Sequence, residues 1–291
     1  MTSASGLQGS SIAQRLSEAG YRVRGLTRNA AQRSQIEATG AQPIVVDFTD
    51  LTSLVQAFKQ AEAVVFTAPI DHRSGVREQL SAQIAEAVEK AQVNRIVFNS
   101  AADIFEDYDR PTSQVLRAMR DRLCSSNASV ITLQPTVYMN NLTAPWAAPA
   151  IVNEGVFAYP IESNWLISWI SHQTLADFAL AAVRYETAGN HHFLIGGPEP
   201  LTADTISTIL SDTLGKSIRH VPIDRSDFAA GLNQAYGAPA GDDIADFYRY
   251  LENHSQALVR DGSAATALGV TPESFLDWAT RQDWTQLGQM S

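Results

Sequence analysis

The chain has 291 residues, of which 45% are hydrophobic and 18% charged, and its formal net charge is -10. This balance is typical of a soluble globular protein, and its acidity argues against nucleic acid or an anionic membrane as the main partner. The single cysteine, Cys124, leaves no internal disulfide, which favours a reducing, cytoplasmic location. The sequence shows no apolar run long enough for a membrane helix and no secretory signal pattern.

Short apolar strands alternate with helices through the first half of the chain. The spacing predicts strands at residues 21–27, 42–46, 63–67, 95–99 and 129–133. It predicts a first helix that ends at Gly20, followed by helices over residues 30–39, 50–60, 76–91 and 111–124. This alternation predicts a Rossmann-like, doubly wound α/β fold, with a mostly parallel sheet, helices on both faces and ligands at the carboxyl ends of the strands.

The pattern loosens after Pro135. Segments of mixed character or strand character follow at residues 156–159, 166–170, 192–195 and 218–221, and helices are expected at residues 174–185, 202–214, 226–236 and 242–254. Thr271 is expected to be the N-cap of the last helix, with Pro272 at its first position. We therefore expect a dinucleotide-binding domain over residues 1–150 and a smaller α+β substrate region over residues 151–291, with some segments returning to the first sheet.

A glycine turn precedes the first helix. Gly6 and Gly9 stand three residues apart, and glycines at such a turn let a pyrophosphate approach the free N–H groups at a helix start. An ordinary turn has the same pattern. The usual form of the motif has another glycine at the position of Ser3. The usual motif also follows a buried central strand, whereas here only Met1 and Thr2 precede the turn. Three explanations stay open: an earlier natural start, which we favour, a gap closed by the neighbouring strands, or a strand supplied by a partner chain.

The residues after each predicted strand are the candidate cofactor ligands. Arg28 follows the second strand, where an acid would bind a ribose diol and an arginine suits a 2′-phosphate, so it favours NADP(H), unless it is a solvated surface arginine. Asp47 and Phe48 follow the third strand near the expected adenine, although Asp47 equally suits a helix-approach cap.

The next two strand ends carry small and hydroxyl residues. Thr67, Ala68 and Pro69 follow the fourth strand and would let a cofactor pass, and Ser100 follows the fifth. Ser100 either touches the substrate or the nicotinamide, or caps a loop.

Several motifs together resemble the NmrA-like branch of the atypical short-chain dehydrogenases/reductases. They are Ser5-Gly6-Leu7-Gln8-Gly9, Leu26-Thr27-Arg28-Asn29, Gly40-Ala41 through Val46-Asp47, Leu133 through Asn141, and Leu268 through Pro272 with Phe275 and Trp278. The resemblance implies a Rossmann domain, a small substrate domain and NADP(H) bound partly by the Ser5–Gly9 turn. Members include quinone, dye and phenylpropanoid reductases, and other members only sense the nucleotide and regulate partners.

The chain departs from that family at its proton donor. It has no Tyr-x-x-x-Lys pair and no lysine between Lys90 and Lys216, whereas some relatives use a lysine on the helix that here carries Arg117. An arginine stays protonated, so it orients or polarises but hardly donates a proton. The candidate catalytic residues are therefore Arg117 and Tyr138, although an aromatic residue at the position of Tyr138 more often packs between domains. The missing lysine weakens the case for carbonyl reduction, but it is compatible with hydride transfer to an acceptor that takes its proton from water.

The candidate substrate residues are Asn140, Asn141, His72 and Trp169, each of which has a structural alternative. The asparagines suit helix caps, His72 a polar loop and Trp169 a domain core. The histidines form no metal-ligand pattern, so we expect no metal.

We expect an NADPH-dependent oxidoreductase that transfers hydride to a small, aromatic or conjugated, quinone-like acceptor. A non-catalytic NADP(H) sensor and a non-redox isomerase or cyclase are the alternatives. The partner is a small molecule, and a homo-oligomer is left open.

Overall fold

The structure is a computed structural model that describes residues 1–71 and 73–290. The chain divides into two compact units. The first unit comprises Met1–Pro135, His172–Ile195 and Ala264–Val270, and the second comprises Thr136–Ser171, Gly196–Ser263 and Thr271–Ser291. The chain thus passes between the units several times, and two segments after residue 150, His172–Ile195 and Ala264–Val270, belong to the first unit.

The first unit contains two sets of parallel strands. One set has the order β3-β4-β5-β7, and the other pairs β1 with β2. The bounds are β1 (Arg24–Thr27), β2 (Gln42–Val45), β3 (Val64–Thr67), β4 (Arg95–Asn99), β5 (Ser129–Pro135) and β7 (His191–Ile195). Residues 1 and 2 connect the sets, because the N–H of Leu26 donates to the Met1 carbonyl (2.9 Å) and the N–H of Thr2 donates to the Val65 carbonyl (3.0 Å).

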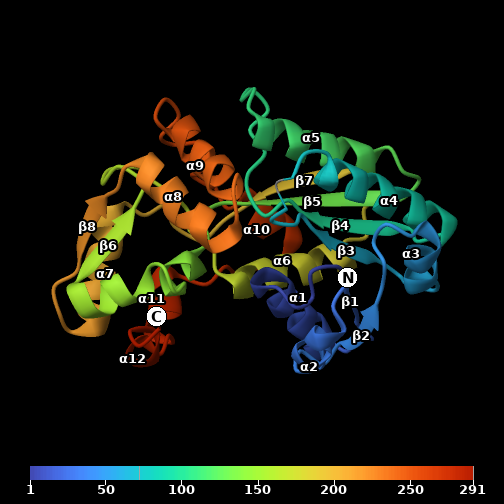
Figure 1. Ribbon diagram of the computed structural model, residues 1–291, viewed down its shortest axis with the longest axis horizontal. Coiled ribbons are helices and arrows are strands. Elements are labelled where there is room, and N and C mark those ends of the chain that lie inside the picture. Colours follow the sequence, from blue (N-terminus) through green and yellow to red (C-terminus); the bar gives the residue numbers. More distant parts are fainter. Residues whose placement is uncertain (72, 291) are drawn as a thin grey trace. The chain divides into compact units, whose positions relative to one another are not determined.

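Helices cover both faces of these strands, with α3, α4 and α5 on one face and α1 and α6 on the other (Figure 1). The bounds are α1 (Leu7–Glu18), η1 (Ala30–Gln32), α2 (Arg33–Glu37), α3 (Leu51–Phe58), α4 (Val76–Lys90), α5 (Pro111–Cys124), α6 (His172–Arg184) and α10 (Ser263–Leu268). The Rossmann-like, doubly wound fold that the alternating pattern predicts is therefore confirmed.

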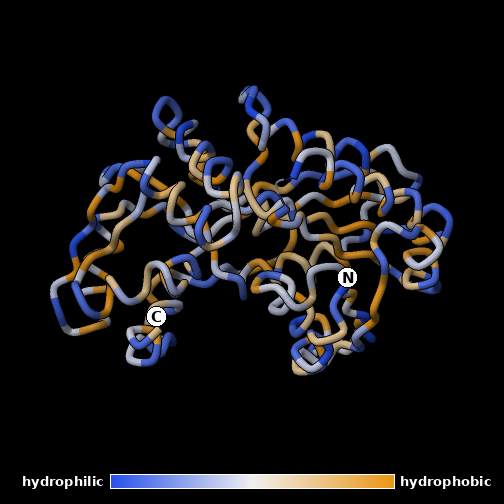
Figure 2. Tube along the Cα trace, viewed as in Figure 1, coloured by the Kyte–Doolittle hydropathy of each residue, from blue (hydrophilic) through white to orange (hydrophobic). Residues whose placement is uncertain are grey.

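The apolar runs of the sequence form the core of the first unit. β3 is buried at every position, and its Phe66 stacks on Phe98 of β4 with ring centroids 5.5 Å apart. Figure 2 shows the hydrophobic colour along these strands and hydrophilic stretches on the outer helices. A strand buried on both faces needs an unbroken apolar run, and β3 and β4 each have one.

The second unit contains one short parallel pair of strands, β6 with β8, surrounded by helices. The bounds are η2 (Met139–Thr143), η3 (Ala150–Glu154), β6 (Val156–Tyr159), α7 (Ala203–Leu214), β8 (Arg219–Pro222), α8 (Arg225–Tyr236), α9 (Ala240–Leu251), α11 (Phe275–Thr280) and α12 (Trp284–Leu287). Its core is aromatic, with Tyr159, Phe157 and Trp169 in mutual ring contact.

The first predicted strand and the last predicted helix both begin later than predicted. The first predicted strand begins at Arg24 rather than at residue 21. The N-cap of α11 is Ser274 and not Thr271. The Ser274 hydroxyl accepts the N–H of Asp277 (3.1 Å) and donates to the Asp277 carboxylate (2.6 Å). This N-cap starts the helix three residues later than the Thr271-Pro272 pair suggests.

Candidate functional site

The turn before α1 is a close-packed loop built on Ser3, Gly6 and Gly9. The N–H of Gly6 donates to the Ser3 carbonyl (2.9 Å), and Ser3 has a φ of 54°. A Cβ atom added at Gly9 would lie 1.9 Å from the Ser3 carbonyl oxygen, so only glycine fits at that position. Gly6 is the N-cap of α1 and makes no side-chain cap bond, which leaves the N–H groups of the first helical turn directed at the loop.

A cavity of about 340 Å³ lies beside this turn, at the carboxyl ends of β1 and β3 in the first unit. Its walls come from the turn, from the segments after three strands and from one face of α4. The lining residues are Thr2, Ser3, Ser5, Gly6, Leu26, Thr27, Arg28, Gln32, Asp47, Phe48, Thr49, Thr67, Pro69, Asp71, Val76, Gln79, Leu80 and Gln83. The cavity is thus where a doubly wound fold binds its ligand.

The described lining residues of the cavity include one cation that faces solvent. Arg28 is exposed, and it follows Thr27, whose hydroxyl donates to the Gln32 side-chain oxygen (2.6 Å). Asp47 is less available, because its carboxylate accepts from both the N–H (2.8 Å) and the hydroxyl (2.6 Å) of Thr49. The hydroxyl bond from Thr49 lowers the pKa of Asp47, with a smaller contribution from the backbone bond. Asp47 therefore caps its own turn, while Arg28 remains open to an anion.

A second acid of the lining is also paired. Asp71 bonds the Arg73 guanidinium through both oxygens, at 2.9 and 2.6 Å, and this pairing lowers the pKa of Asp71. His72, a predicted substrate residue, lies outside the described residues.

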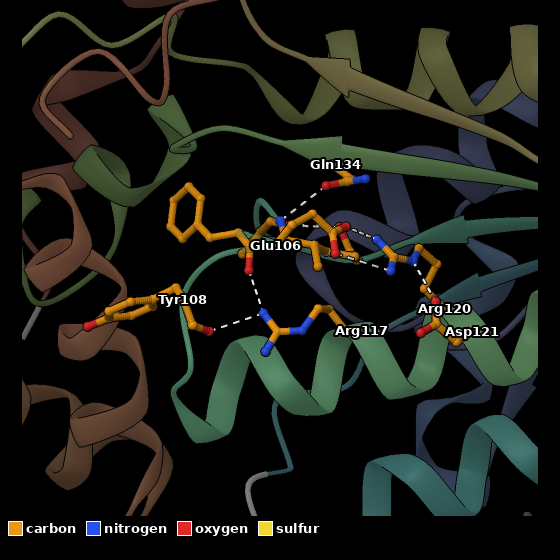
Figure 3. Close-up of polar contacts among 10 residues, drawn as sticks. Glu106, Tyr108, Arg117, Arg120, Asp121 and Gln134 are labelled. Carbon is orange, nitrogen blue, oxygen red and sulfur yellow. Dashed lines mark hydrogen bonds and ion pairs between the residues drawn. The ribbon is translucent and has the colours of Figure 1, made fainter.

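The loop after β4 is held by side chains of α5 and β5 (Figure 3). The Arg117 guanidinium donates to the carbonyls of Phe105 (2.5 Å) and Tyr108 (3.1 Å), and the Gln134 side-chain oxygen accepts the N–H of Ile104 (3.1 Å). Arg120 binds the carboxylate of Glu106 one turn further along α5. In this structure Arg117 orders the loop backbone.

Ser100 begins the same loop and is buried. Its hydroxyl lies 2.6 Å from the Ala102 carbonyl and 3.0 Å from the Leu133 carbonyl, so it can donate to either. The capping alternative for Ser100 accounts for these contacts.

Of the predicted cofactor residues, the cavity brings together Ser5, Gly6, Arg28, Asp47, Phe48, Thr67 and Pro69. It is not lined by Leu7, Gln8, Gly9, Ala68 or Ser100. Leu7 is exposed, Gln8 accepts a bond from the Asn99 amide (2.8 Å), and Gly9 acts through its missing Cβ.

Four further predicted residues belong to the second unit. Trp169 is buried and packs on Phe157 and Phe275, as the core alternative expects. The Asn141 amide donates to the Tyr159 hydroxyl (2.8 Å), which lies 2.8 Å from the Tyr248 hydroxyl. Burial raises the pKa of Tyr159 to about 12, so this hydroxyl stays protonated at neutral pH. Tyr138 is buried before η2, and Asn140 is half-buried within it.

Sequence reasoning missed the helical wall of the cavity. Val76, Gln79, Leu80 and Gln83 recur at intervals of three, one and three residues, which places them on one face of α4. The spacing was visible in the sequence, but nothing in it shows which strand ends that face covers.

Within residues 1–71 and 73–290, three or more His, Cys, Asp or Glu side chains do not gather into a metal-binding group. Over the same residues, every helix is too short or too polar to cross a membrane.

Three known proteins are similar over nearly the whole chain. An NAD(P)H azoreductase from Xenophilus azovorans is 24% identical over 268 residues, covering 92% of this chain and 89% of that protein. An NADPH-dependent quinone oxidoreductase from Escherichia coli, solved with NADPH, has a TM-score of 0.76 and 20% identity, covering 96% of this chain and 97% of that one. A Citrobacter triphenylmethane reductase, solved with NADP(H), has a TM-score of 0.78 and 19% identity, covering 97% and 98%.

The family comparison agrees with the sequence motifs and with the fold. The model of the NmrA-like family matches residues 1–288. The chain therefore belongs to the NmrA-like family.

Proposed function

We propose that this protein is an NADPH-dependent oxidoreductase that reduces a small, conjugated or aromatic acceptor of the quinone, azo or dye class. The observation that carries the proposal is a single cavity bounded at one side by the glycine turn and at another by the exposed Arg28. A dinucleotide phosphate needs both features, because its pyrophosphate binds a helix start and its 2′-phosphate needs a cation.

The residues present fit such a cofactor. The turn at Ser5 and Gly6 would hold the pyrophosphate against the N–H groups of α1, and Gly9 keeps that turn compact. Arg28 would pair with the 2′-phosphate, and Phe48 offers an apolar ring for the adenine. Asp47 caps its own turn and would leave the ribose phosphate to Arg28.

The bound cofactor would supply the hydride, and the chain would bind, orient and exclude water. Arg117 holds the carbonyls of Phe105 and Tyr108, so its part would be to position the loop after β4 rather than to donate a proton. The sequence has no Tyr-x-x-x-Lys pair. A quinone or an azo dye suits this arrangement, since such an acceptor can take its proton from water. The three relatives act on acceptors of this kind by their names, at 19–24% identity.

A sensor of NADP(H) is the second candidate, favoured by the same lack of a paired proton donor. It would share every cofactor contact and differ only in turnover. The substrate role of Asn140, Asn141 and Trp169, the catalytic role of Tyr138, a cytoplasmic location and homo-oligomer formation remain proposals.

The test is a pair of measurements on the purified chain. Fluorescence titration should show tighter binding of NADPH than of NADH, and NADPH oxidation should be accelerated by members of a panel of quinones, azo dyes and triphenylmethane dyes. NADPH binding without turnover across the panel would favour the sensor. Equal affinity for the two cofactors would contradict the role of Arg28, and no binding of either would refute the cofactor proposal.

A further inference from the structure

One wall of the cavity beside the glycine turn is a face of α4 that the proposed phosphate contacts leave unused. The residues on this wall are Val76, Gln79, Leu80 and Gln83. The glycine turn and Arg28 would take the pyrophosphate and the 2′-phosphate. The α4 wall is therefore available to the base that the same ribose carries.

This wall offers an apolar surface to a flat ring. Val76 and Leu80 are half-buried and lie one turn apart on α4. Phe48 is also half-buried and lines the same cavity from the segment after β2. A planar base that packs on these side chains still has a polar edge, and a few well-placed polar groups of a pocket normally bind such an edge.

The side-chain amide of Gln83 is held in one orientation. Its Nε2 donates to the Thr49 carbonyl (3.1 Å). Because a carbonyl oxygen only accepts hydrogen bonds, the bonded atom of the amide is the nitrogen, and Oε1 is the atom left over. Within residues 1–71 and 73–290, Oε1 of Gln83 bonds no other group. Gln83 thus lines the cavity with a free acceptor whose identity is fixed.

Asp47 is the other acceptor near the expected base, and it suits the task less well. Its Oδ1 already accepts both the N–H (2.8 Å) and the hydroxyl (2.6 Å) of Thr49. Asp47 is exposed, whereas Gln83 is half-buried. A hydrogen bond formed away from water is stronger, so Gln83 is the acceptor that would discriminate between bases.

We propose that Gln83 selects adenine, with its Oε1 accepting a hydrogen bond from the amino group at C6 of the base. The proposal rests on the proposed function, because the base belongs to the bound NADPH. Hypoxanthine and guanine carry an acceptor oxygen at C6, which would face Oε1 without a proton between them. A site with such a fixed polar group rejects the ligand that leaves it unpaired.

The probe is the reduced form of nicotinamide hypoxanthine dinucleotide phosphate, which differs from NADPH only in its 6-oxo base. Fluorescence titration gives both dissociation constants, and the readout is the constant of the 6-oxo analogue divided by that of NADPH. In the unmodified chain this ratio should be at least about ten. Both nucleotides carry the same phosphates, so damage to the fold or to the phosphate contacts weakens both and leaves the ratio unchanged.

Two substitutions at Gln83 change the ratio in different ways. Gln83→Leu removes the acceptor, so it should weaken NADPH binding and bring the ratio close to one. Gln83→Lys keeps a donor for the Thr49 carbonyl but has no acceptor, and its ammonium group favours the oxygen of the 6-oxo base, so the ratio should fall below one. Gln56→Leu is the matched control, since Gln56 is exposed on α3 and does not line the cavity. Its ratio should equal that of the unmodified chain.

The outcomes separate this proposal from the proposed function. Equal affinity of the unmodified chain for the two nucleotides would overturn the role of Gln83 and leave NADPH binding intact. A ratio that Gln83→Leu preserves would also overturn it, and loss of that ratio in Asp47→Asn would make Asp47 the residue that reads the base. Binding of neither nucleotide would refute both proposals.

Discussion

Arg28 is the residue on which cofactor choice depends in our proposal. It is exposed at the rim of the cavity, and both nearby acids of the lining, Asp47 and Asp71, are engaged in bonds of their own. A 2′-phosphate bound there would gain charge-assisted hydrogen bonds to a guanidinium.

The substitution Arg28→Ala should weaken NADPH binding by roughly ten- to a hundredfold, the loss expected for hydrogen bonds to a charged group, and leave NADH binding unchanged. Titration of both cofactors measures it. Arg33→Ala is the matched control, since Arg33 is exposed on the next helix and does not line the cavity. Equal losses for NADPH and NADH would show that Arg28 supports the fold and not the phosphate.

Gly9 is the second residue whose substitution has a specific expected effect. Its substitution by alanine places a Cβ atom 1.9 Å from the Ser3 carbonyl oxygen, so the turn must open. Gly9→Ala should destabilise the fold by about 1–3 kcal/mol and weaken NADPH binding at least tenfold. Gly231→Ala is the control, because an added Cβ meets nothing within 4 Å there and the helix α8 should gain about 0.5–1 kcal/mol. Urea unfolding and NADPH titration compare them, and unchanged binding in Gly9→Ala would separate the turn from the cofactor.

The loop after β4 and the helix α5 form one unit through Arg117, Arg120 and Gln134 (Figure 3). These three side chains bind backbone and carboxylate groups of one loop, so together they fix the conformation of that loop. Their positions on a regular helix and strand make that conformation reproducible.

Arg117→Ala should lower kcat modestly, by well under a thousandfold, because it removes a positioning group and not a proton donor. Arg117→Lys should recover part of the loss, since one ammonium can still reach a loop carbonyl. The pH profile of kcat should keep its shape in both variants, and Arg122→Ala on the same helix should behave as the unmodified chain. A loss beyond a thousandfold, or a shifted pH profile, would assign Arg117 a direct part in proton transfer.

At the scale of the whole molecule, two buried bases predict acid sensitivity. Burial lowers the pKa of His172 from 6.5 to about 4, and burial followed by the charge of Arg24 lowers the pKa of the Met1 ammonium from 8.0 to about 5. At a pH between the unfolded and folded pKa values of either group, the unfolded chain binds a proton that the folded chain does not. The free energy of unfolding should therefore fall as the pH decreases from 8 to 4.

Urea unfolding at intervals between pH 4 and pH 8 measures this decrease. A stability that stays constant from pH 8 to pH 4 would contradict both assignments.

The local sequence pattern was sufficient to predict the order of the elements and the parallel, doubly wound sheet. It also identified the glycine turn and Arg28, which line the same cavity. Apolar periodicity and glycine spacing are properties of neighbouring residues, and burial of both faces gives β3 and β4 apolar runs that can be recognised without knowledge of their partners. The shortened first strand and the Ser274 cap were missed, because the ends of an element depend on which hydrogen bonds form.

Only the tertiary structure decided what each polar side chain contacts. It directed Arg117 to two loop carbonyls and Asn141 to Tyr159, and it placed one face of α4 over the cavity beside the glycine turn. It also showed residues 1 and 2 pairing with β1 and β3. Such contacts join residues far apart in the chain or depend on the path of the backbone, so no spacing in the sequence encodes them.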